Sequence, residues 1–304
     1  MRIGLINQLN GRPGAMPPPP SWSSVAERAT VAEAAGFDMF VFEDALLYRG
    51  QDHTNGLWES GTIAGALAAT TKTIRFGQSV VNSPYRSPAM VASMVTTLDE
   101  VSGGRYVLGI GAGTTEDSDY EAFGFPTDRR YSRFAEAIQI IHRLLKTGTA
   151  DFDGEFYTVR DSELVLRGPS PEGPPINIAA GGEKMLALVA RYGDEWNWWG
   201  WDETIPEIEE RLRPILTTLS QACGAEDRDP DSLTRTFDLY SVVAPGFEAD
   251  HGLKQPVSGS AEQIAAYLLD LGTLGFDEVR CDVWPKSAAA VAAMAPIVEL
   301  VHRA

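Results

Sequence analysis

The 304-residue chain has little of what several large protein classes require. Its two cysteines, Cys223 and Cys281, are too few for a disulfide framework or a cysteine metal site, and they fit a reducing cytoplasm. The four histidines are scattered, so we expect no bound metal. No apolar run reaches the roughly 18–20 residues of a bilayer span, and the N-terminus resembles a strand rather than a signal peptide. We therefore expect a soluble cytoplasmic protein.

Positive charge is scarce as well. Lysine and arginine number 25 against 42 aspartates and glutamates, which gives a formal net charge of −17. A chain this acidic repels phosphate backbones and anionic lipid, so we expect neither a nucleic acid nor a membrane surface as a partner. The hydrophobic content of 44% excludes an intrinsically disordered chain.

The chain does contain an almost continuous alternation of short apolar runs and amphipathic stretches. Strands are predicted at 2–6, 39–43, 74–81, 106–110, 176–180, 195–197, 236–243 and 278–283. Helices are predicted at 24–35, 59–70, 88–102, 130–147, 184–192, 206–223, from Ser260 onward, and at 287–302. Eight strand–helix pairs in this order favour an α/β fold, a (β/α)8 TIM barrel with inserted loops, as a single domain over 1–304. A Rossmann-like domain with a second lobe is the alternative, but no G-x-G-x-x-G follows the first strand.

Three local features modify this pattern. Aromatic and apolar residues among glycines and prolines predict a hairpin-like insertion at about 151–175. Pro214 lies inside the helix predicted at 206–223 and should kink or split it. Ser260 and Gln263 form the sequence pattern of a capping box at a helix start.

Loops after the C-terminal ends of the strands build the active site of such a barrel. Here these ends are glycine-rich, aromatic and poor in basic residues, and neither G-x-S-x-G nor a P-loop is present. This composition suits a large planar ligand and an anion bound by backbone amides. Gly181-Gly182, before a helix that includes Lys184, predicts a phosphate site, and Gly111-Ala112-Gly113 a surface for a ring. An ordinary tight turn is the alternative for both.

Four tryptophans occur within the six residues 196–201, at a strand end. One interpretation is a wall for an apolar or aromatic substrate, formed by Trp198 and Trp199. The alternative is packing beneath the inserted hairpin.

Four segments resemble the bacterial luciferase-like flavin and deazaflavin oxidoreductases. They are AAGFDMFVFED (34–44), TTKTIRFGQSVVNSPYRSPAMVASMVTTLDEVSGGRYVLGIGAG (70–113), PPINIAAGG with ARYGD (174–194), and VSGSAEQIAAYLLDLGTLGFDEV (257–279). The resemblance implies a (β/α)8 barrel that holds the cofactor ring at the strand ends and acts on a small-molecule substrate. It also implies a homodimer formed through barrel helices.

The same resemblance implies roles for individual residues. The third strand should end in a bulge with a non-prolyl cis peptide at Ser79-Val80, which backs the ring. Asp44 should contact the cofactor near the ring, with Gly111 and Ala112 flanking it. The cofactor phosphate should lie among Ala179, Ala180, Gly181 and Gly182.

The chain also departs from its relatives. Those that oxidise a sugar phosphate have histidine after the aspartate and glutamate after the glycine-rich strand end, where this chain has Ala45 and Thr114. A sugar-phosphate dehydrogenase is therefore disfavoured. The proton donor is expected among Glu43, Tyr48, His53 and Glu116, although each of them also has a plausible structural or solvated role.

Three functions remain open from the sequence. The first is coenzyme F420-dependent hydride transfer to or from a small organic substrate, which the Asp44 and Ser79-Val80 matches favour. The second is an FMN-dependent monooxygenase that uses reduced flavin and oxygen on the same scaffold. The third is a flavin-binding barrel without catalysis.

Overall fold

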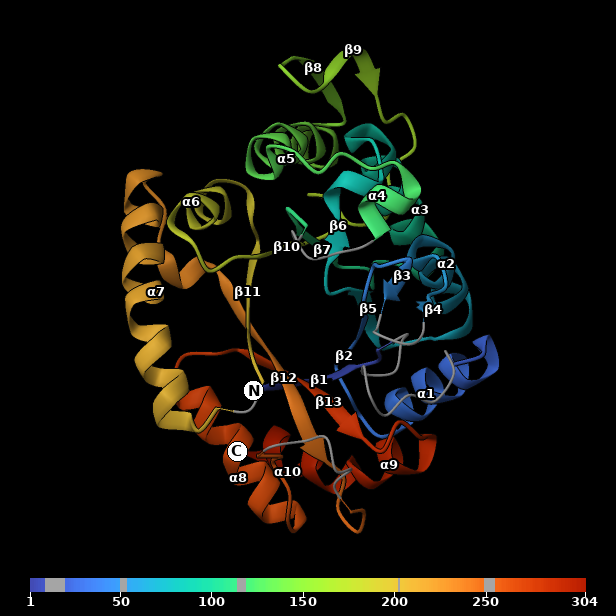
Figure 1. The fold of residues 1–304 in the computed structure, drawn as a ribbon, viewed down its shortest axis with the longest axis vertical. Helices are drawn as coiled ribbons and strands as arrows, with labels where there is room; N and C mark the ends of the chain where they lie inside the picture. The colour runs from blue at the N-terminus through green and yellow to red at the C-terminus, as the bar shows by residue number, and fades with distance from the viewer. Residues whose placement is uncertain (9–19, 50–53, 114–118, 202, 249–254) are drawn as a thin grey trace.

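The computed structural model describes residues 1–8, 20–49, 54–113, 119–201, 203–248 and 255–304. Its main sheet is parallel and runs in the order β5-β2-β1-β13-β12-β11-β10-β7-β6 (Figure 1). The strands are β1 (Arg2–Ile6), β2 (Met39–Phe42), β5 (Arg75–Gln78), β6 (Val81–Asn82), β7 (Leu108–Gly111), β10 (Ile176–Ala179), β11 (Glu195–Gly200), β12 (Thr234–Val243) and β13 (Glu278–Trp284).

The sheet closes on itself. Only Ser79 and Val80 separate β5 from β6, so these two segments are successive pieces of one strand. β6 pairs with β7, and Phe76 of β5 pairs with the segment just before β7. The Phe76 N–H donates to the Arg105 carbonyl at 3.1 Å, and the Phe76 carbonyl accepts from the Val107 N–H at 3.0 Å. The two ends of the sheet therefore meet, and eight strands form a barrel. The predicted fold class is confirmed.

Helices surround this barrel (Figure 1). They are α1 (Trp22–Ala34), α2 (Ser60–Thr70), α3 (Pro88–Ser102), α4 (Asp119–Phe123), α5 (Arg130–Thr147), α6 (Glu183–Tyr192), α7 (Ile205–Ala225), α8 (Ala261–Thr273), α9 (Ala288–Ala293) and α10 (Ala295–Arg303). The main core lies between helices and strands, where alternate strand residues such as Leu5 and Val279 are fully buried. In the described part of the chain, no helix has the length and apolarity needed to cross a membrane.

Several predicted elements have the predicted bounds, and others differ for local reasons. The strand at 2–6 and the helices at 88–102 and 130–147 are confirmed, as is the capping box at Ser260. The strand predicted at 74–81 is interrupted at Ser79-Val80. The helix predicted at 287–302 is two helices, because Pro296 has no N–H to donate and occupies the first turn of α10. α7 is not split: it continues through Pro214.

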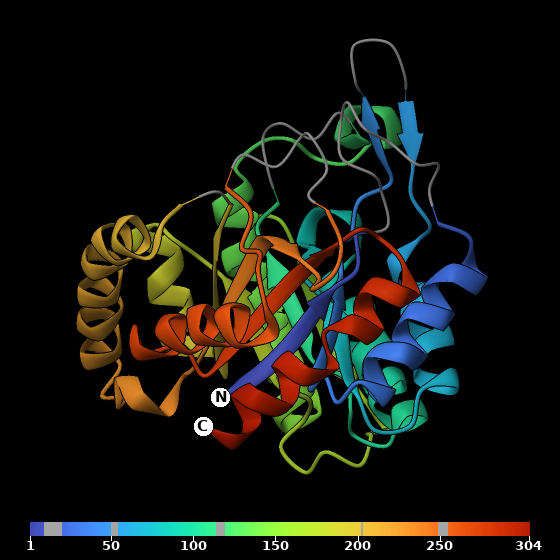
Figure 2. The same ribbon diagram turned by 90° about the horizontal axis from the view of Figure 1, so that it is seen from below.

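Two hairpins extend from the barrel. Residues 149–163 form the antiparallel pair β8 (Thr149–Asp153) and β9 (Thr158–Glu163), at the position of the predicted hairpin-like insertion. A second pair, β3 (Leu47–Arg49) and β4 (Thr54–Gly56), follows β2 and was not predicted, because its short strands lack an apolar face. Figure 2 shows this second hairpin at the opposite end of the barrel from both chain termini.

The barrel interior below the strand ends is charged. Arg75 pairs with Glu195 at 2.7 Å, and the buried Arg280 pairs with Glu278 at 2.6 Å and with Glu195 at 3.6 Å. Burial opposes ionisation of Glu195, but Arg75 and Arg280 outweigh it and lower the pKa of this carboxyl. Paired charges therefore fill the centre of the barrel, where unpaired ones would be too costly to bury.

Candidate active site

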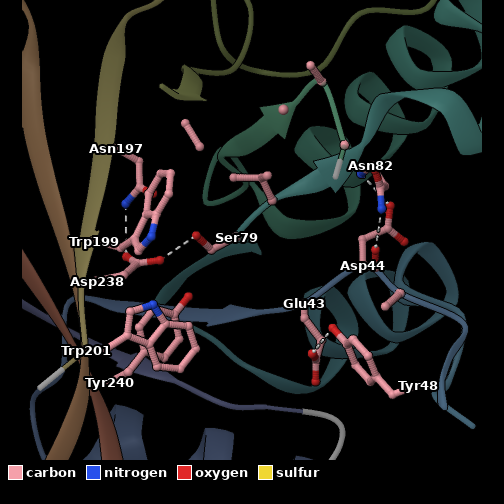
Figure 3. A pocket seen from close by; sticks show the side chains of 16 residues that line it. Glu43, Asp44, Tyr48, Ser79, Asn82, Asn197, Trp199, Trp201, Asp238 and Tyr240 are labelled. Atoms are coloured by element: carbon pink, nitrogen blue, oxygen red, sulfur yellow. Dashed lines mark hydrogen bonds between the residues drawn. The ribbon is translucent and has the colours of Figure 1, made fainter. Parts of the chain in front are cut away.

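A cavity of about 310 Å³ lies at the C-terminal ends of the barrel strands (Figure 3). Its size is at the lower end of the usual range for small-molecule sites. β2 and the following loop contribute one side, β5–β7 and β10 the back, and β11 and β12 the other side. The lining residues are Glu43, Asp44, Ala45, Tyr48, Ser79, Val80, Asn82, Gly111, Ala112, Gly113, Ala179, Asn197, Trp199, Trp201, Asp238 and Tyr240.

The back of the cavity is a smooth strip of small side chains and backbone. The Ser79-Val80 peptide is cis, as the resemblance implied, and Val80 lies directly over Gly111. A Cβ atom on Gly111 would come within 2.9 Å of Val80 Cγ2, and one on Gly109 within 2.0 Å of the Gln78 carbonyl oxygen. Glycine at these two positions lets neighbouring strands approach closely. Together with Ala112 and Ala179, the strip offers a surface on which a planar ring fits.

Asp44 borders the cavity, but its side chain is enclosed. Arg86 donates to both carboxylate oxygens, at 2.7 and 3.1 Å, and the Ser60 hydroxyl and the Asn82 N–H donate at 2.6 and 2.8 Å. Arg86 also binds Glu59, and these two acids raise the pKa of Arg86 although its burial opposes this. In this structure Asp44 ties the end of β2 to β6 and to Arg86, and its contact with a cofactor stays a prediction.

Glu43 and Tyr48 form a polar pair on the β2 side. The Tyr48 hydroxyl donates to Glu43 Oε2 at 3.0 Å, and both residues line the cavity (Figure 3). An acid beside a phenol is a pair of groups that can hold a proton next to a bound substrate. The structure thus brings together two of the expected proton donors, while His53 and Glu116 lie outside the described residues, as does Thr114.

Asp238 is the acid on the opposite side. It accepts a hydrogen bond from Ser79 Oγ at 2.7 Å and from Asn197 Nδ2 at 3.0 Å (Figure 3). Burial raises the pKa of Asp238, and the Arg280 guanidinium at 3.7 Å opposes this only in part. Tyr240, two residues further along β12, has its pKa raised well above 10 by burial and by the charges of Asp238 and Glu43.

The tryptophans of β11 face in two directions because successive strand residues alternate. Trp199 lines the cavity and is 37% exposed, and Trp201 stacks on Tyr240 with ring centroids 4.2 Å apart. Trp198 is 2% exposed and lies on the outer face of the strand, against Phe237 and beneath the Arg211 guanidinium. Trp198 therefore does not line this cavity, whereas Trp199, Trp201 and Tyr240 do. The substrate wall itself stays a prediction.

Of the residues expected around the phosphate, Ala179 lines the cavity, and Ala180, Gly181 and Gly182 follow it outside the lining. Gly181 and Gly182 are exposed after β10, and Gly182 is the N-cap of α6 without a side-chain cap. Ala180 is buried, and its carbonyl accepts the Trp196 indole N–H at 2.8 Å. A helix start that lacks a capping side chain leaves backbone N–H groups for an anion. The phosphate contact itself stays a prediction.

Ala45, named only as a departure from relatives, lines the cavity, and so do residues that were not proposed as site residues from the sequence: Asn82, Asn197, Trp201, Asp238 and Tyr240. Four of them lie on β11 and β12 or directly after β11, at alternate positions. Their spacing of two was visible in the sequence, but the face that points inward was not. Barrel strands are buried on both sides, so hydrophobic alternation gives no direction.

The chain belongs to the luciferase-like monooxygenase family, whose model matches residues 1–250. It is 41% identical over 128 residues to a 5,10-methylenetetrahydromethanopterin reductase from Archaeoglobus fulgidus, covering 42% of this chain and 37% of the reductase. It is 34% identical to an F420-dependent glucose-6-phosphate dehydrogenase from Beutenbergia cavernae, over 73% of this chain and 63% of the dehydrogenase.

Among solved structures, an F420-dependent secondary alcohol dehydrogenase in complex with an F420–acetone adduct has the same fold. Its TM-score is 0.80 at 16% identity, over 99% of this chain and 98% of that one. The chain spans less than two thirds of the length of both curated relatives named above.

Proposed function

We propose that this protein is an oxidoreductase that transfers a hydride between coenzyme F420 and a small organic substrate. The observation that carries the proposal is the strip at the back of the cavity, where Val80 lies against Gly111 beside Ala112 and Ala179. F420-dependent relatives by sequence and by fold support the choice of cofactor. A reduced deazaflavin bound there would supply the hydride, and the protein would supply position and protons.

The residues present fit such a cofactor. A side chain on Gly111 would overlap Val80, so the flat surface depends on glycine at this position. The uncapped start of α6 after Gly181-Gly182 would hold a phosphate through its amides. Asp44, held by Arg86, would fix the end of β2 at the rim of the cavity.

Glu43 and Tyr48 would handle the substrate proton. Reduction of a carbonyl needs a proton at oxygen as the hydride reaches carbon. When Glu43 is protonated and donates to the phenol oxygen, the Tyr48 hydroxyl would give its own hydrogen to the substrate. The hydrogen bond to Glu43 then provides a route for reprotonation of the phenol. Trp199 and the stacked Trp201–Tyr240 pair would cover the substrate and exclude water.

Titration of the purified protein with F420 and with FMN tests this proposal. We expect micromolar binding of F420, weaker binding of FMN, and oxidation of reduced F420 by at least one member of a panel of ketones, aldehydes and activated alkenes. Micromolar binding of FMN without binding of F420 would instead favour the flavin monooxygenase. Binding of F420 without turnover by any acceptor would favour a storage barrel.

We also propose that the protein is a cytoplasmic homodimer built from single-domain subunits. On the outer side of α3, Met90 and Val101 are both more than half exposed and lie about three turns apart on one face. Such apolar positions on a barrel helix support association through this layer. Light scattering of the purified protein measures the mass: a monomer at micromolar concentration would contradict the dimer.

A further inference from the structure

Ser79 and Asp238 form a hydrogen bond across the cavity. The direction of this hydrogen bond decides whether Ser79 can donate to a bound ligand. Both residues line the cavity, and Ser79 Oγ donates its single proton to Asp238 Oδ2 at 2.7 Å (Figure 3). A serine hydroxyl has one hydrogen and two lone pairs. With its hydrogen committed to Asp238, Ser79 can only accept from a ligand.

We propose that the protonation state of Asp238 sets the hydrogen-bonding polarity of Ser79 toward the cavity. While Asp238 is ionised, the Ser79 hydroxyl accepts from an N–H or O–H group of the ligand. When Asp238 carries a proton on Oδ2, it donates to Ser79 Oγ, and the serine proton becomes free to bind a carbonyl or ring nitrogen. Asp238 is in this sense a positioning residue that selects the donor or acceptor character of the ligand atom next to Ser79.

The proton must reside on Oδ2 because the other oxygen is already committed. Asn197 Nδ2 donates to Asp238 Oδ1 at 3.0 Å and to Thr236 Oγ1 at 3.1 Å, so both amide hydrogens are used. Asn197 and Thr236 are buried, which fixes this arrangement. Arg280 approaches the same oxygen, Oδ1, at 3.7 Å. A proton on Asp238 therefore goes to the oxygen that faces Ser79.

The surroundings of Asp238 favour its protonated form more than water does. Burial raises the pKa of Asp238, the charge of Glu278 adds to this rise, and Arg280 on β13 opposes it. Arg280 is shared, because it binds Glu278 at 2.6 Å and Glu195 of β11 at 3.6 Å, both closer than Asp238. Tyr240 on β12 and Cys281 on β13 also interact with the charge of Asp238, and Glu43 after β2 interacts with Tyr240. Burial raises the pKa of the Cys281 thiol to about 12.

Asp238→Asn is the variant that fixes one state. Its Oδ1 can still accept from Asn197, which leaves its Nδ2 to face Ser79 and donate to Oγ, as protonated Asp238 would. Ser79→Ala removes the switched hydroxyl. Asp99→Asn is a matched control, because Asp99 is a buried carboxylate that accepts a serine hydroxyl, from Ser170 at 2.7 Å, and it does not line the cavity.

The first experiment measures the affinity for F420, and for FMN, from about pH 4, near the ordinary pKa of an aspartate, to about pH 8.5. This readout rests on the proposed function. We expect the wild type and Asp99→Asn to show an affinity change of about fivefold, the size of one neutral hydrogen bond. Asp238→Asn should keep the low-pH affinity of the wild type at every pH. Ser79→Ala should lose the fivefold change of affinity with pH. An Asp238→Asn profile that follows the wild type would overturn the inference.

The second experiment needs no ligand and separates a failure of the inference from a failure of the proposed function. Infrared difference spectra between the same two pH values should show a carboxylic-acid band in the wild type. This band should be absent in Asp238→Asn, shifted in Ser79→Ala and unchanged in Asp99→Asn. A wild-type band that survives Asp238→Asn, or the lack of any band, would refute the switch whatever the protein binds. If neither cofactor binds but the band behaves as expected, the proposed function fails and the inference stands.

Discussion

The cavity has two buried aspartates at the ends of its strands, and their partners differ. Asp44, after β2, is held by a bidentate arginine at 2.7 and 3.1 Å. Asp238, on β12, receives a serine hydroxyl and an amide, and its nearest guanidinium lies 3.7 Å away and is shared with two other acids. Two hydrogen bonds from Arg86 hold the Asp44 carboxylate in place, whereas burial raises the pKa of Asp238 and the more distant Arg280 opposes this only in part. The difference separates a structural acid from a responsive one.

Removal of Arg86 tests the anchored side and has the largest expected effect on stability. Arg86→Ala leaves Asp44 buried without its counter-ion, and we expect a loss of about 3–5 kcal/mol in the free energy of unfolding. Urea denaturation measures this loss. Arg213→Ala breaks an exposed pair with Glu209 and serves as the control, with an expected cost below about 1 kcal/mol. Equal costs for both variants would show that Asp44 is not anchored as described.

The two faces of β11 give a second comparison. Trp198→Ala removes a fully packed side chain and should cost about 3–5 kcal/mol of stability. Trp199→Ala removes a partly exposed ring of the cavity and should change stability by less than about 1 kcal/mol while it raises KM. Denaturation and steady-state kinetics on both variants check this. If Trp198→Ala raised KM with little loss of stability, the assignment of the two faces would be wrong.

Tyr48→Phe tests the β2 side of the cavity for proton transfer. Without the phenol proton, we expect kcat to fall by about a hundredfold, which corresponds to about 2.7 kcal/mol, at unchanged stability. The measurement is the oxidation of reduced F420 by the acceptor that turns over fastest. Tyr267→Phe is the matched control, since the Tyr267 hydroxyl donates to the Glu203 carbonyl at 3.3 Å, away from the cavity. An unchanged kcat in Tyr48→Phe would assign the proton to another group.

The smallest effect is the opposite pH dependence of stability expected at Asp238 and Glu59. The pKa of Asp238 is raised by burial above 3.8, so its ionisation costs stability, and this cost appears as pH rises through the raised pKa. The pKa of Glu59 is lowered from 4.5 to about 2, because Arg86, Thr62 and Gly61 outweigh its burial. The contribution of ionised Glu59 to the free energy of unfolding is present above pH 4.5 and is lost as pH falls toward 2.

Denaturation across pH separates the two acids. As pH rises above about 4, Asp238→Asn should gain stability relative to the wild type, whereas Glu59→Gln should lose stability relative to the wild type as pH rises from about 2 to 4.5. Parallel curves for the two variants would contradict the contrast between the sides of the cavity.

Much of the fold follows from local patterns. Pro88 begins α3, and Gly103, with φ +67°, ends it in a left-handed conformation that glycine adopts without strain. The glycine and small residues of the strip were also predictable, because close approach of two strands requires them. The split last helix was not predicted, and the interruption of the third strand at Ser79-Val80 was expected only from the family resemblance, since a backbone interruption inside an apolar run leaves the hydrophobic pattern unchanged.

The candidate site was predictable only in part. Glu43 and Tyr48 are only five residues apart, so the short segment between them brings their side chains into hydrogen-bond contact. Ser79 and Asp238 are 159 positions apart, and their contact depends on the closure of the barrel and on the register of every strand between them. No local pattern contains that information.

The amino-acid sequence by itself determined the order of strands and helices, the closed barrel and the smooth strip for a ring. These depend on side-chain periodicity and on the space that glycine leaves, which are properties of short segments. The tertiary structure alone decided which alternate residues of β11 and β12 face the cavity and which of the two aspartates is bound by an arginine through both carboxylate oxygens. Burial on both faces of a barrel strand hides the inward side from the sequence, and an ion pair exists only once distant strands are in register.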